Sequence, residues 1–205
     1  MSGFFYFYHI SIKKMKVKLY FILFFFLLFP KFIFAQITVT NKEEAKKVLQ
    51  KAIDDLNTLN CESSLNNAQK LLQYSLRNND NSYAAKAYNI IGLNYEEFSD
   101  LKKALYYYKE GIKYAIKASD KQLLEYLYNN IGNLYFFGLD NPEKGLEYYF
   151  KCYKYSLKYA DKLEIAFTEL NIVAAYFRLE KFDAGKVYLD KILPTLKSEN
   201  DFEMY

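Results

Sequence analysis

The residue types that perform nucleophilic or metal chemistry are almost missing from this sequence. His9 is the only histidine, and it lies in a leader-like segment at the start of the chain. Without histidine, the rest of the chain has no Ser-His-Asp or Cys-His nucleophile and no histidine-ligated metal site. The acidic pair Glu96 and Glu97 has no second carboxylate or oxyanion donor beside it, which favours a solvated helix surface. We therefore expect no enzyme activity, no cofactor and no metal.

Asparagines and aromatic residues offer a different chemistry, which is binding. The segment YNNIGNLYFFG, residues 128 to 138, holds three asparagines and four aromatic residues. A side-chain amide presents both a donor and an acceptor, which suits the backbone of an extended peptide. What these residues bind depends on the elements that position them.

The first 35 residues differ from the rest in composition. Lys16 and Lys18 precede an apolar run over residues 19–29, and Ala35 supplies a small residue at the expected cleavage point. This pattern is typical of a secretory signal peptide, with Met15 as an alternative start. The other interpretation is an uncleaved anchor formed by residues 19–35, although the apolar run is shorter than the roughly 18 residues of a spanning helix. We expect export to the periplasm or beyond.

The positive charge of the chain belongs to this leader. The whole sequence has 28 basic and 24 acidic residues, and five of the lysines but none of the acids lie within residues 1–35. The remainder therefore has 23 basic and 24 acidic residues. Because nucleic-acid binding depends on a positive surface, we expect no nucleic-acid partner.

Three segments of the remaining chain repeat one another: YNIIGLNYEEF at 88–98, YNNIGNLYFFG at 128–138 and ELNIVAAYFRL at 169–179. Each is followed by a second helix-forming segment. Glycine inside a helix costs roughly 1 kcal/mol relative to alanine, so its recurrence indicates close helix contacts.

These segments resemble the tetratricopeptide repeat, whose signature combines aromatic, small and aliphatic residues at fixed spacings. The resemblance implies an all-α fold, a right-handed solenoid of stacked antiparallel helix hairpins, of the extended kind found in bacterial signalling proteins. Glu169 and Val173 depart from the signature, and we expect Val173 to widen the junction between the second and third repeats. The residues that match packing positions are Tyr88, Ile91, Gly92, Tyr95, Ala104, Tyr108, Tyr128, Ile131, Gly132, Tyr135, Gly145, Tyr149, Ile172, Tyr176, Gly185 and Leu189.

The copies lie 40 or 41 residues apart, whereas the family's usual period is 34. We expect about one extra turn in each helix and longer linkers between hairpins. The predicted organisation is a degenerate or capping hairpin over 36–80, repeats over about 81–119, 120–160 and 161–200, and an incomplete repeat from 201 to 205.

Several helix boundaries are predicted from capping residues. The first helix is expected to begin at Asn41 and to end near Leu59, and the second is expected over Ser64–Arg77. Ser119 with Gln122 predicts a capping box, and Asn141 followed by Pro142 predicts a helix start.

The resemblance also implies a binding site. In the family, the first helix of each hairpin lines a concave groove, and an asparagine before the signature aliphatic residue binds peptide backbone. Ile90 holds that place in the first copy, and lysines that would clamp a terminal carboxylate are missing from the matching places. An ordinary solvated helix surface is the alternative interpretation. The implied groove residues are Asn130, Asn133, Phe136, Asn171 and Arg178.

Two further clusters are explained by packing. Tyr106, Tyr107 and Tyr108 look like an aromatic box, but helical spacing places Tyr108 in a core stripe and Tyr107 at its margin. Cys61 and Cys152 lie two repeats apart, so we expect two free thiols, with Cys152 packed as a small apolar residue.

The last predicted helix, over 182–193, ends the series of complete repeats. It would expose Val187, Leu189 and Ile192, which solenoids normally cover with a polar cap. Either the chain is a truncated form of a longer protein or a partner covers this end.

The sequence therefore predicts an exported, non-enzymatic scaffold that binds a protein or peptide partner. The alternative is the extracytoplasmic sensor part of a bacterial histidine kinase or transcription regulator, which similar repeats often form. Membrane contact is expected only through residues 19–35, if they are not cleaved.

Overall fold

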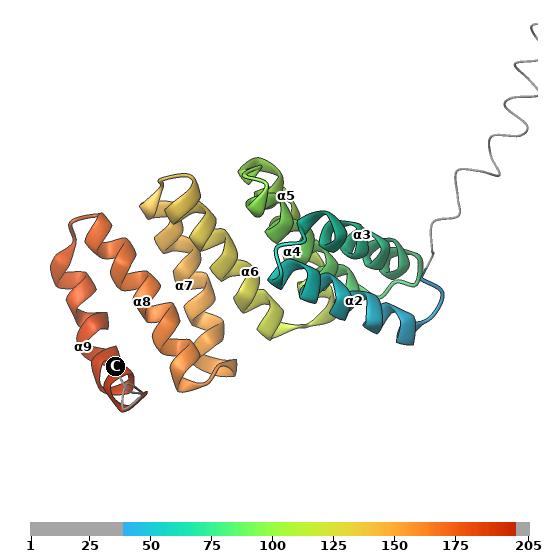
Figure 1. Ribbon diagram of the computed structural model, residues 1–205. Coiled ribbons are helices and arrows are strands. Elements are labelled where there is room, and N and C mark those ends of the chain that lie inside the picture. Colours follow the sequence, from blue (N-terminus) through green and yellow to red (C-terminus); the bar gives the residue numbers. More distant parts are fainter. Residues whose placement is uncertain (1–38, 200–205) are drawn as a thin grey trace, which may run out of the picture. The chain divides into compact units, whose positions relative to one another are not determined.

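The computed structural model describes residues 39–199, which form eight α-helices, one π-helical turn and no strand. No helix in this range is long and apolar enough to cross a membrane. The leader expected over 1–35 and the incomplete repeat at 201–205 lie outside the described residues. The elements are α2 (Lys42–Asn57), α3 (Cys61–Arg77), α4 (Asn81–Glu97), α5 (Leu101–Ala118), α6 (Lys121–Asn133), η2 (Leu134–Gly138), α7 (Pro142–Tyr159), α8 (Lys162–Arg178) and α9 (Phe182–Glu199) (Figure 1).

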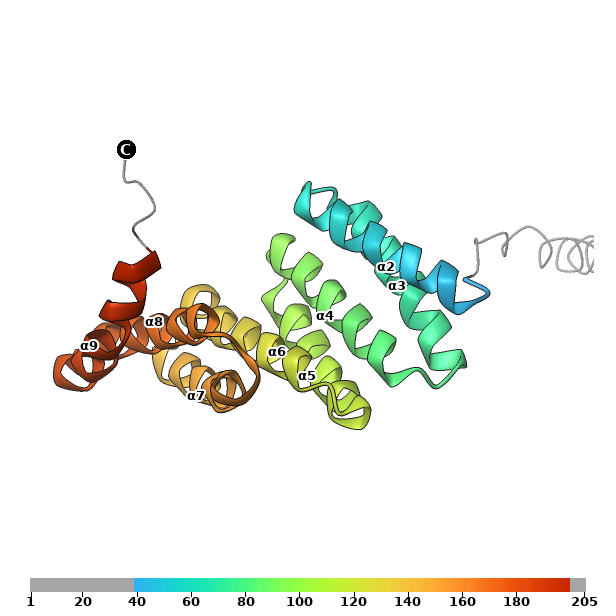
Figure 2. The ribbon, with the colours of Figure 1, turned by 90° about the horizontal axis from the view of Figure 1, so that it is seen from below.

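Each helix packs against the next one in the chain, so that the helices form four hairpins, α2/α3, α4/α5, α6/α7 and α8/α9 (Figures 1 and 2). The first helices of neighbouring hairpins also meet, because α4 contacts both α2 and α6. The all-α solenoid of stacked hairpins predicted from the sequence is therefore confirmed.

Aspartate or asparagine caps begin most of these helices. In each case the side chain accepts a hydrogen bond from the backbone N–H three residues later, which satisfies a free donor of the first turn. The start at Asn141 is confirmed. The capping box predicted at Ser119 is wrong, because Ser119 ends α5 with φ 57° and Asp120 caps α6. The caps are Asn41, Asp80, Asp100, Asp120, Asn141 and Asp161.

The additional length of the repeats lies in the helices. The two helices of each later hairpin are joined by three residues, and α5 is joined to α6, like α7 to α8, by only two. The prediction of longer linkers is therefore wrong. Most of the helices have 16 to 18 residues, about one turn more than the family's 34-residue period accommodates.

The π-helical turn η2 absorbs a one-residue insertion. Ala104 lies twelve positions after Gly92, and Gly185 lies twelve positions after Val173, but Gly145 lies thirteen positions after Gly132. The connection after the helix still has three residues, so the extra residue lies within the helix and widens one turn. The α6/α7 hairpin therefore keeps the turn geometry of its neighbours despite the insertion.

The signature glycines let two helices of one hairpin approach closely. A Cβ atom added to Gly92 would lie 2.5 Å from the Tyr108 ring, and one added to Gly132 would lie 2.6 Å from the Tyr149 ring. Both tyrosines are fully buried. In the α8/α9 hairpin, Val173 and Leu189, which is smaller than tyrosine, pack together in the same cluster. Val173 therefore packs between the two helices of one hairpin, whereas it was expected to widen the junction between the second and third repeats.

Tyrosine stacks line the same hairpin interfaces. In the second hairpin of the described chain, Tyr88 stacks on Tyr114 and Tyr95 on Tyr107, with ring centroids 5.3 and 5.2 Å apart. The third hairpin repeats the arrangement with the pairs Tyr128–Tyr155 and Tyr135–Tyr148. Tyr107 is partly buried, as its marginal place in the stripe predicts.

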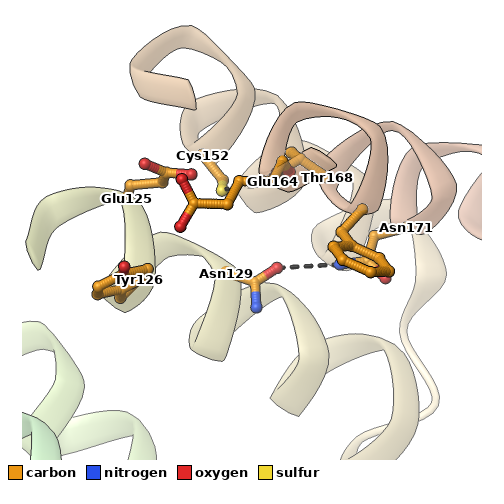
Figure 3. Close-up of a pocket in the computed structure, with 8 residues that line it drawn as sticks. Glu125, Tyr126, Asn129, Cys152, Glu164, Thr168 and Asn171 are labelled. Carbon is orange, nitrogen blue, oxygen red and sulfur yellow. Dashed lines mark hydrogen bonds between the residues drawn. The ribbon is translucent and has the colours of Figure 1, made fainter. Parts of the chain in front are cut away.

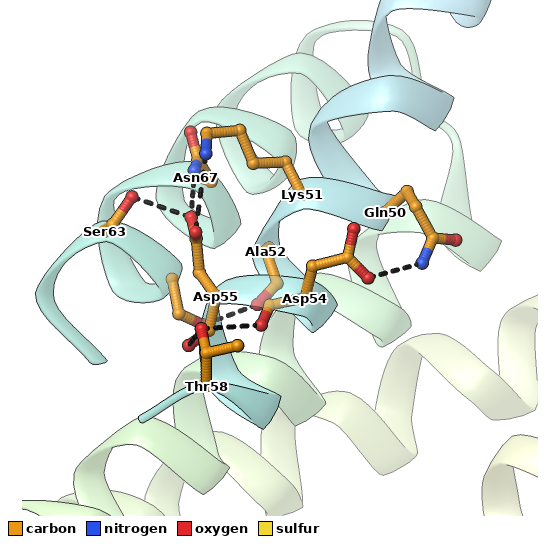
Figure 4. Close-up of polar contacts among 9 residues, drawn as sticks. Gln50, Lys51, Ala52, Asp54, Asp55, Thr58, Ser63 and Asn67 are labelled. Atoms are coloured by element: carbon orange, nitrogen blue, oxygen red, sulfur yellow. Dashed lines mark hydrogen bonds and ion pairs between the residues drawn. The ribbon is translucent and has the colours of Figure 1, made fainter. Parts of the chain in front are cut away.

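The first hairpin, α2/α3, closes through polar contacts instead of a glycine. Asp55 accepts hydrogen bonds from Ser63 at 2.7 Å and from Asn67 at 3.0 Å (Figure 4). The amide of Asn94 in α4 donates to Ser64 Oγ at 2.8 Å, which ties the next hairpin to this one. Helix α3 begins at Cys61, three residues before the predicted start, and so includes both serines.

The last helix is longer and better packed than predicted. Helix α9 continues through Pro194 to Glu199. Val187 is 68% exposed, as expected, but Ile192 is buried and Leu189 is partly buried against α8. The expectation that all three residues are exposed is therefore wrong for Leu189 and Ile192.

Candidate functional site

A row of paired asparagine amides joins the first helices of three hairpins. Asn130 Nδ2 in α6 donates to Asn89 Oδ1 in α4 at 3.0 Å. Asn171 Nδ2 in α8 donates to Asn129 Oδ1 in α6 at the same distance. All four side chains are partly buried. We call these four residues the amide row.

The amide row follows the period of the repeats. Asn89 and Asn129 occupy equivalent places, and so do Asn130 and Asn171, because their spacings match those of the signature glycine position. In each pair, the later hairpin provides the donor and the earlier one the acceptor. A side-chain amide has two donors and two acceptor lone pairs, so each member keeps hydrogen-bonding capacity.

The other predicted groove residues make contacts outside the amide row. The Tyr149 hydroxyl donates to Asn133 Oδ1 at 2.9 Å, which places Asn133 inside its own hairpin. Phe136 packs on Tyr149 and against Gly145 in the same interface. Arg178 is exposed at the end of α8 and pairs with Asp140 at 2.8 Å. Of the five predicted groove residues, Asn130 and Asn171 are the two that belong to the amide row.

An open pocket of about 160 Å³ adjoins the amide row. It lies among α6, α7 and α8, and the paired amides of Asn129 and Asn171 form one side of it (Figure 3). Its other walls carry acidic, aromatic and small polar groups. The lining residues are Glu125, Tyr126, Asn129, Cys152, Glu164, Phe167, Thr168 and Asn171.

The deepest acid of the pocket is Glu125, which is only 5% exposed. Its Oε1 accepts a 2.6 Å hydrogen bond from Ser156 of α7, whose hydroxyl lies 3.2 Å from that of Thr168 in α8. Burial raises the pKa of Glu125, the bond from Ser156 opposes this, and the charges of Glu164 and Asp161 raise it further. The carboxylate of Glu125 therefore lies near the carboxylate of Glu164 in partly dehydrated surroundings.

Cys152 lies at the base of the same pocket. Its Sγ contacts the hydroxyls of Ser156 and Thr168, each at 3.7 Å, and it is almost fully buried. Burial raises the pKa of this thiol to about 11, so that it stays protonated at neutral pH. Both cysteines are free, which confirms the expectation of two separate thiols.

In the last hairpin, an ion pair with a buried carboxylate stands where the earlier hairpins have their first tyrosine pair. Glu169, which departs from the repeat signature, is 3% exposed and pairs with Lys191 of α9. It also accepts a 2.6 Å hydrogen bond from the Tyr153 hydroxyl of α7. These contacts connect the last two hairpins and satisfy a carboxylate that would otherwise be costly to bury.

Sequence reasoning missed the polar residues of the pocket. Glu125, Ser156 and Thr168 lie outside the repeat signature, so the resemblance does not draw attention to them. A signal was nevertheless present: the equivalent residues one repeat earlier are Ala85, Ala115 and Leu127, all apolar. Comparison of the copies position by position would have identified this change.

Comparison with known proteins identifies the fold. No protein-family model matches the chain, and no curated protein sequence matches it. Among solved structures, the apo form of RapI is 14% identical with a TM-score of 0.70, over 98% of this chain and 72% of that one. BtubC (BKLC) from P. vanneervenii is 15% identical with a TM-score of 0.69, over 83% and 71% of the two chains. At these identities the likeness concerns the fold alone, and the fold of this chain is a tetratricopeptide-like helical solenoid.

Proposed function

We propose that this protein is a non-enzymatic scaffold that binds an extended peptide or protein segment along the first helices of α4/α5, α6/α7 and α8/α9. The amide row carries this proposal. It repeats with the hairpins, it is partly accessible, and it lies beside a pocket large enough for one side chain.

The chemistry of the row suits a peptide backbone. An extended peptide presents N–H and C=O groups at regular intervals, and a side-chain amide can pair with both. In each described pair, one N–H of the donor and one lone pair of the acceptor are engaged. The remaining N–H groups and lone pairs can bind a peptide while the bonds between hairpins persist.

A peptide-binding assay tests this proposal. A phage-displayed library of random hexapeptides would be selected on the purified chain, and the affinity of enriched peptides would be measured by titration calorimetry. The double variant Asn130→Ala/Asn171→Ala is expected to weaken binding at least about tenfold, because each lost hydrogen bond contributes about 1 kcal/mol.

Asn66→Ala is the matched control, since Asn66 is an exposed asparagine on α3. It should leave the affinity unchanged. Circular dichroism would verify that every variant is folded. Equal affinities for wild type and the double variant would contradict the role of the row, and failure to enrich any peptide would contradict the peptide-binding function.

We also propose that binding takes place outside the cytoplasm, on the basis of the basic and apolar leader over residues 1–35. A sensor part of a kinase or transcription regulator would use the same surface for its ligand. Expression of the full chain, cell fractionation and amino-terminal sequencing would test export. Recovery of the uncleaved chain in the cytoplasm would contradict it.

A further inference from the structure

We infer that the pocket among α6, α7 and α8 binds a basic side chain, lysine or arginine, of the peptide held by the amide row. This inference rests on the proposed function and specifies the chemistry of its ligand. It stands on four observations: the charge of the pocket, a carboxylate oxygen of Glu125 that accepts no hydrogen bond from residues 39–199, the aromatic walls, and the comparison with the preceding hairpin junction.

The charge of the pocket is unbalanced. Two of the eight lining residues, Glu125 and Glu164, are acids, and none is lysine or arginine. Figure 3 shows the two carboxylates directed toward the same space. Carboxylates placed together repel one another, and a cation between them relieves that repulsion.

Glu125 also lacks a donor for one of its oxygens. Its Oε1 is occupied by Ser156, whereas Oε2 accepts no hydrogen bond from residues 39–199. A carboxylate oxygen that is not fully enclosed can accept a further hydrogen bond, and an ammonium or guanidinium group supplies a charged N–H donor. The structure therefore offers a specific acceptor for a cationic group at the base of the pocket.

The walls and size of the pocket fit the rest of a basic side chain. Tyr126 and Phe167 are both exposed aromatic residues of the lining, and aromatic faces attract cations while covering aliphatic stems. The volume of about 160 Å³ is similar to that of a cavity of roughly 150 Å³ that accommodates benzene. One side chain fits such a space.

The preceding junction between hairpins has no such pocket chemistry. The residues equivalent to Glu125, Ser156, Glu164 and Thr168 are Ala85, Ala115, Leu123 and Leu127. These four residues are buried and belong to one hydrophobic cluster. Stacked hairpins of this chain can therefore form such a junction from apolar residues alone. The polar residues at the junction of α6, α7 and α8 depart from that packing pattern, as residues of functional sites often do.

The pocket and the row share two residues. Asn129 and Asn171 line the pocket and also form one amide pair. A peptide whose backbone lies on this pair therefore has its nearest side chain beside the pocket opening. The basic residue is expected at the peptide position that contacts the pair between α6 and α8.

Two measurements separate this inference from the proposed function. The first uses hexapeptides selected as above, resynthesised with blocked ends and with lysine, arginine, norleucine or glutamate at each position in turn. The second is an NMR titration with n-butylammonium chloride and, as the neutral control, n-butanol, observing the side-chain amides of Asn129 and Asn171.

The variant Glu125→Gln tests the acceptor, with Glu62→Gln on the exposed surface of α3 as its control. We expect lysine or arginine at one position to strengthen binding at least tenfold over norleucine, and Glu125→Gln to remove that preference. Butylammonium, but not butanol, should shift the two amide signals in the wild type and in Glu62→Gln, but not in Glu125→Gln.

The outcomes are distinct. Peptides that bind without any preference for a basic residue would overturn the inference and leave the proposed function standing. Butylammonium binding lost in Glu125→Gln, with no peptide bound at all, would support a cation pocket and overturn the peptide-binding function. If unblocked peptides without lysine or arginine bind as well as blocked peptides containing them, the ligand is the terminal amine and the side-chain assignment is wrong.

Discussion

Gly132 shows how single residues determine the spacing of a hairpin. An added Cβ would meet the Tyr149 ring at 2.6 Å, and that ring is fully buried. Gly132→Ala should therefore lower the free energy of unfolding by about 1–2 kcal/mol, because overpacking outweighs the roughly 1 kcal/mol of helix propensity gained. Thermal unfolding followed by circular dichroism measures this change, at roughly 2–4 °C for each kcal/mol.

The natural pair Val173 and Leu189 provides the control for this prediction. Both lie in one cluster at the equivalent interface, so a larger residue opposite a smaller one is tolerated there. Gly132→Ala combined with Tyr149→Leu should therefore be more stable than the sum of the two single effects implies. Additive losses would show that the ring and the glycine do not constrain one another.

Glu125 predicts a characteristic dependence of stability on pH. Burial, together with Glu164 and Asp161, raises the pKa of Glu125 in the folded state above that of the unfolded chain. Between these two values, the folded state binds more protons, so the free energy of unfolding falls as pH rises through this window. At pH 7, Glu125→Gln should therefore be at least as stable as wild type.

Melting temperatures of both forms between pH 4 and pH 7 measure this effect. The advantage of Glu125→Gln over wild type should increase with pH, and Glu62→Gln should show no such trend. A constant difference across the range would mean that the folded-state pKa is not raised.

Residues of the repeat signature were predictable from sequence, but their polar neighbours were only partly so. Packing residues recur in each copy, so Gly92, Gly132 and their tyrosines were found. Asn130 and Asn171 were also found, although their partners Asn89 and Asn129 were not, because pairing between helices depends on helical phase. The contacts of Asn133 and Phe136 with Tyr149 were not predicted, because a helix position alone does not specify the neighbouring element.

The π turn η2 makes a prediction at the level of a whole element. It accommodates one extra residue between Gly132 and Gly145. Deletion of Phe137, which is highly exposed, should convert this turn to regular α-helix and align the hairpin with its neighbours. We expect the melting temperature to stay within a few degrees of wild type.

Deletion of Glu97 is the matched control, since it is exposed near the end of α4, where no extra residue exists. This deletion should rotate the last turn by about 100° and lower the melting temperature by more than 5 °C, on the order of 2 kcal/mol. If both deletions destabilise equally, the π turn is not an accommodated insertion.

Helix existence followed from the sequence more reliably than helix ends did. Asn141 before Pro142 is an unambiguous start, whereas Ser119 and Asp120 are adjacent cap candidates and only the backbone distinguishes them. The last helix was predicted to end at residue 193, directly before Pro194. The structure continues α9 past it, because packing on α8 holds the helix together despite one lost backbone hydrogen bond.

For the molecule as a whole, stability should vary along the stack. Hairpins α4/α5 and α6/α7 have neighbours on both sides, whereas α9 contacts only α8 extensively within residues 39–199. Stacked repeats derive stability from nearest-neighbour interfaces. Amide hydrogen exchange, measured by mass spectrometry, should therefore be at least tenfold faster in α9 than in α6. Equal protection in both helices would contradict a stack of nearest-neighbour units.

The tyrosine stacks also give this chain optical properties that can report on each hairpin. The sequence has 22 tyrosines and no tryptophan, so near-ultraviolet absorbance and fluorescence arise from phenol rings without interference from indole. Tyr88, stacked on Tyr114, has its pKa raised by burial to about 12, and burial raises the pKa values of Tyr108 and Tyr149 further. Exposed tyrosines will ionise first during alkaline titration. The buried tyrosines will ionise at higher pH, when the helices of a hairpin separate, so their phenolate absorbance will report that separation.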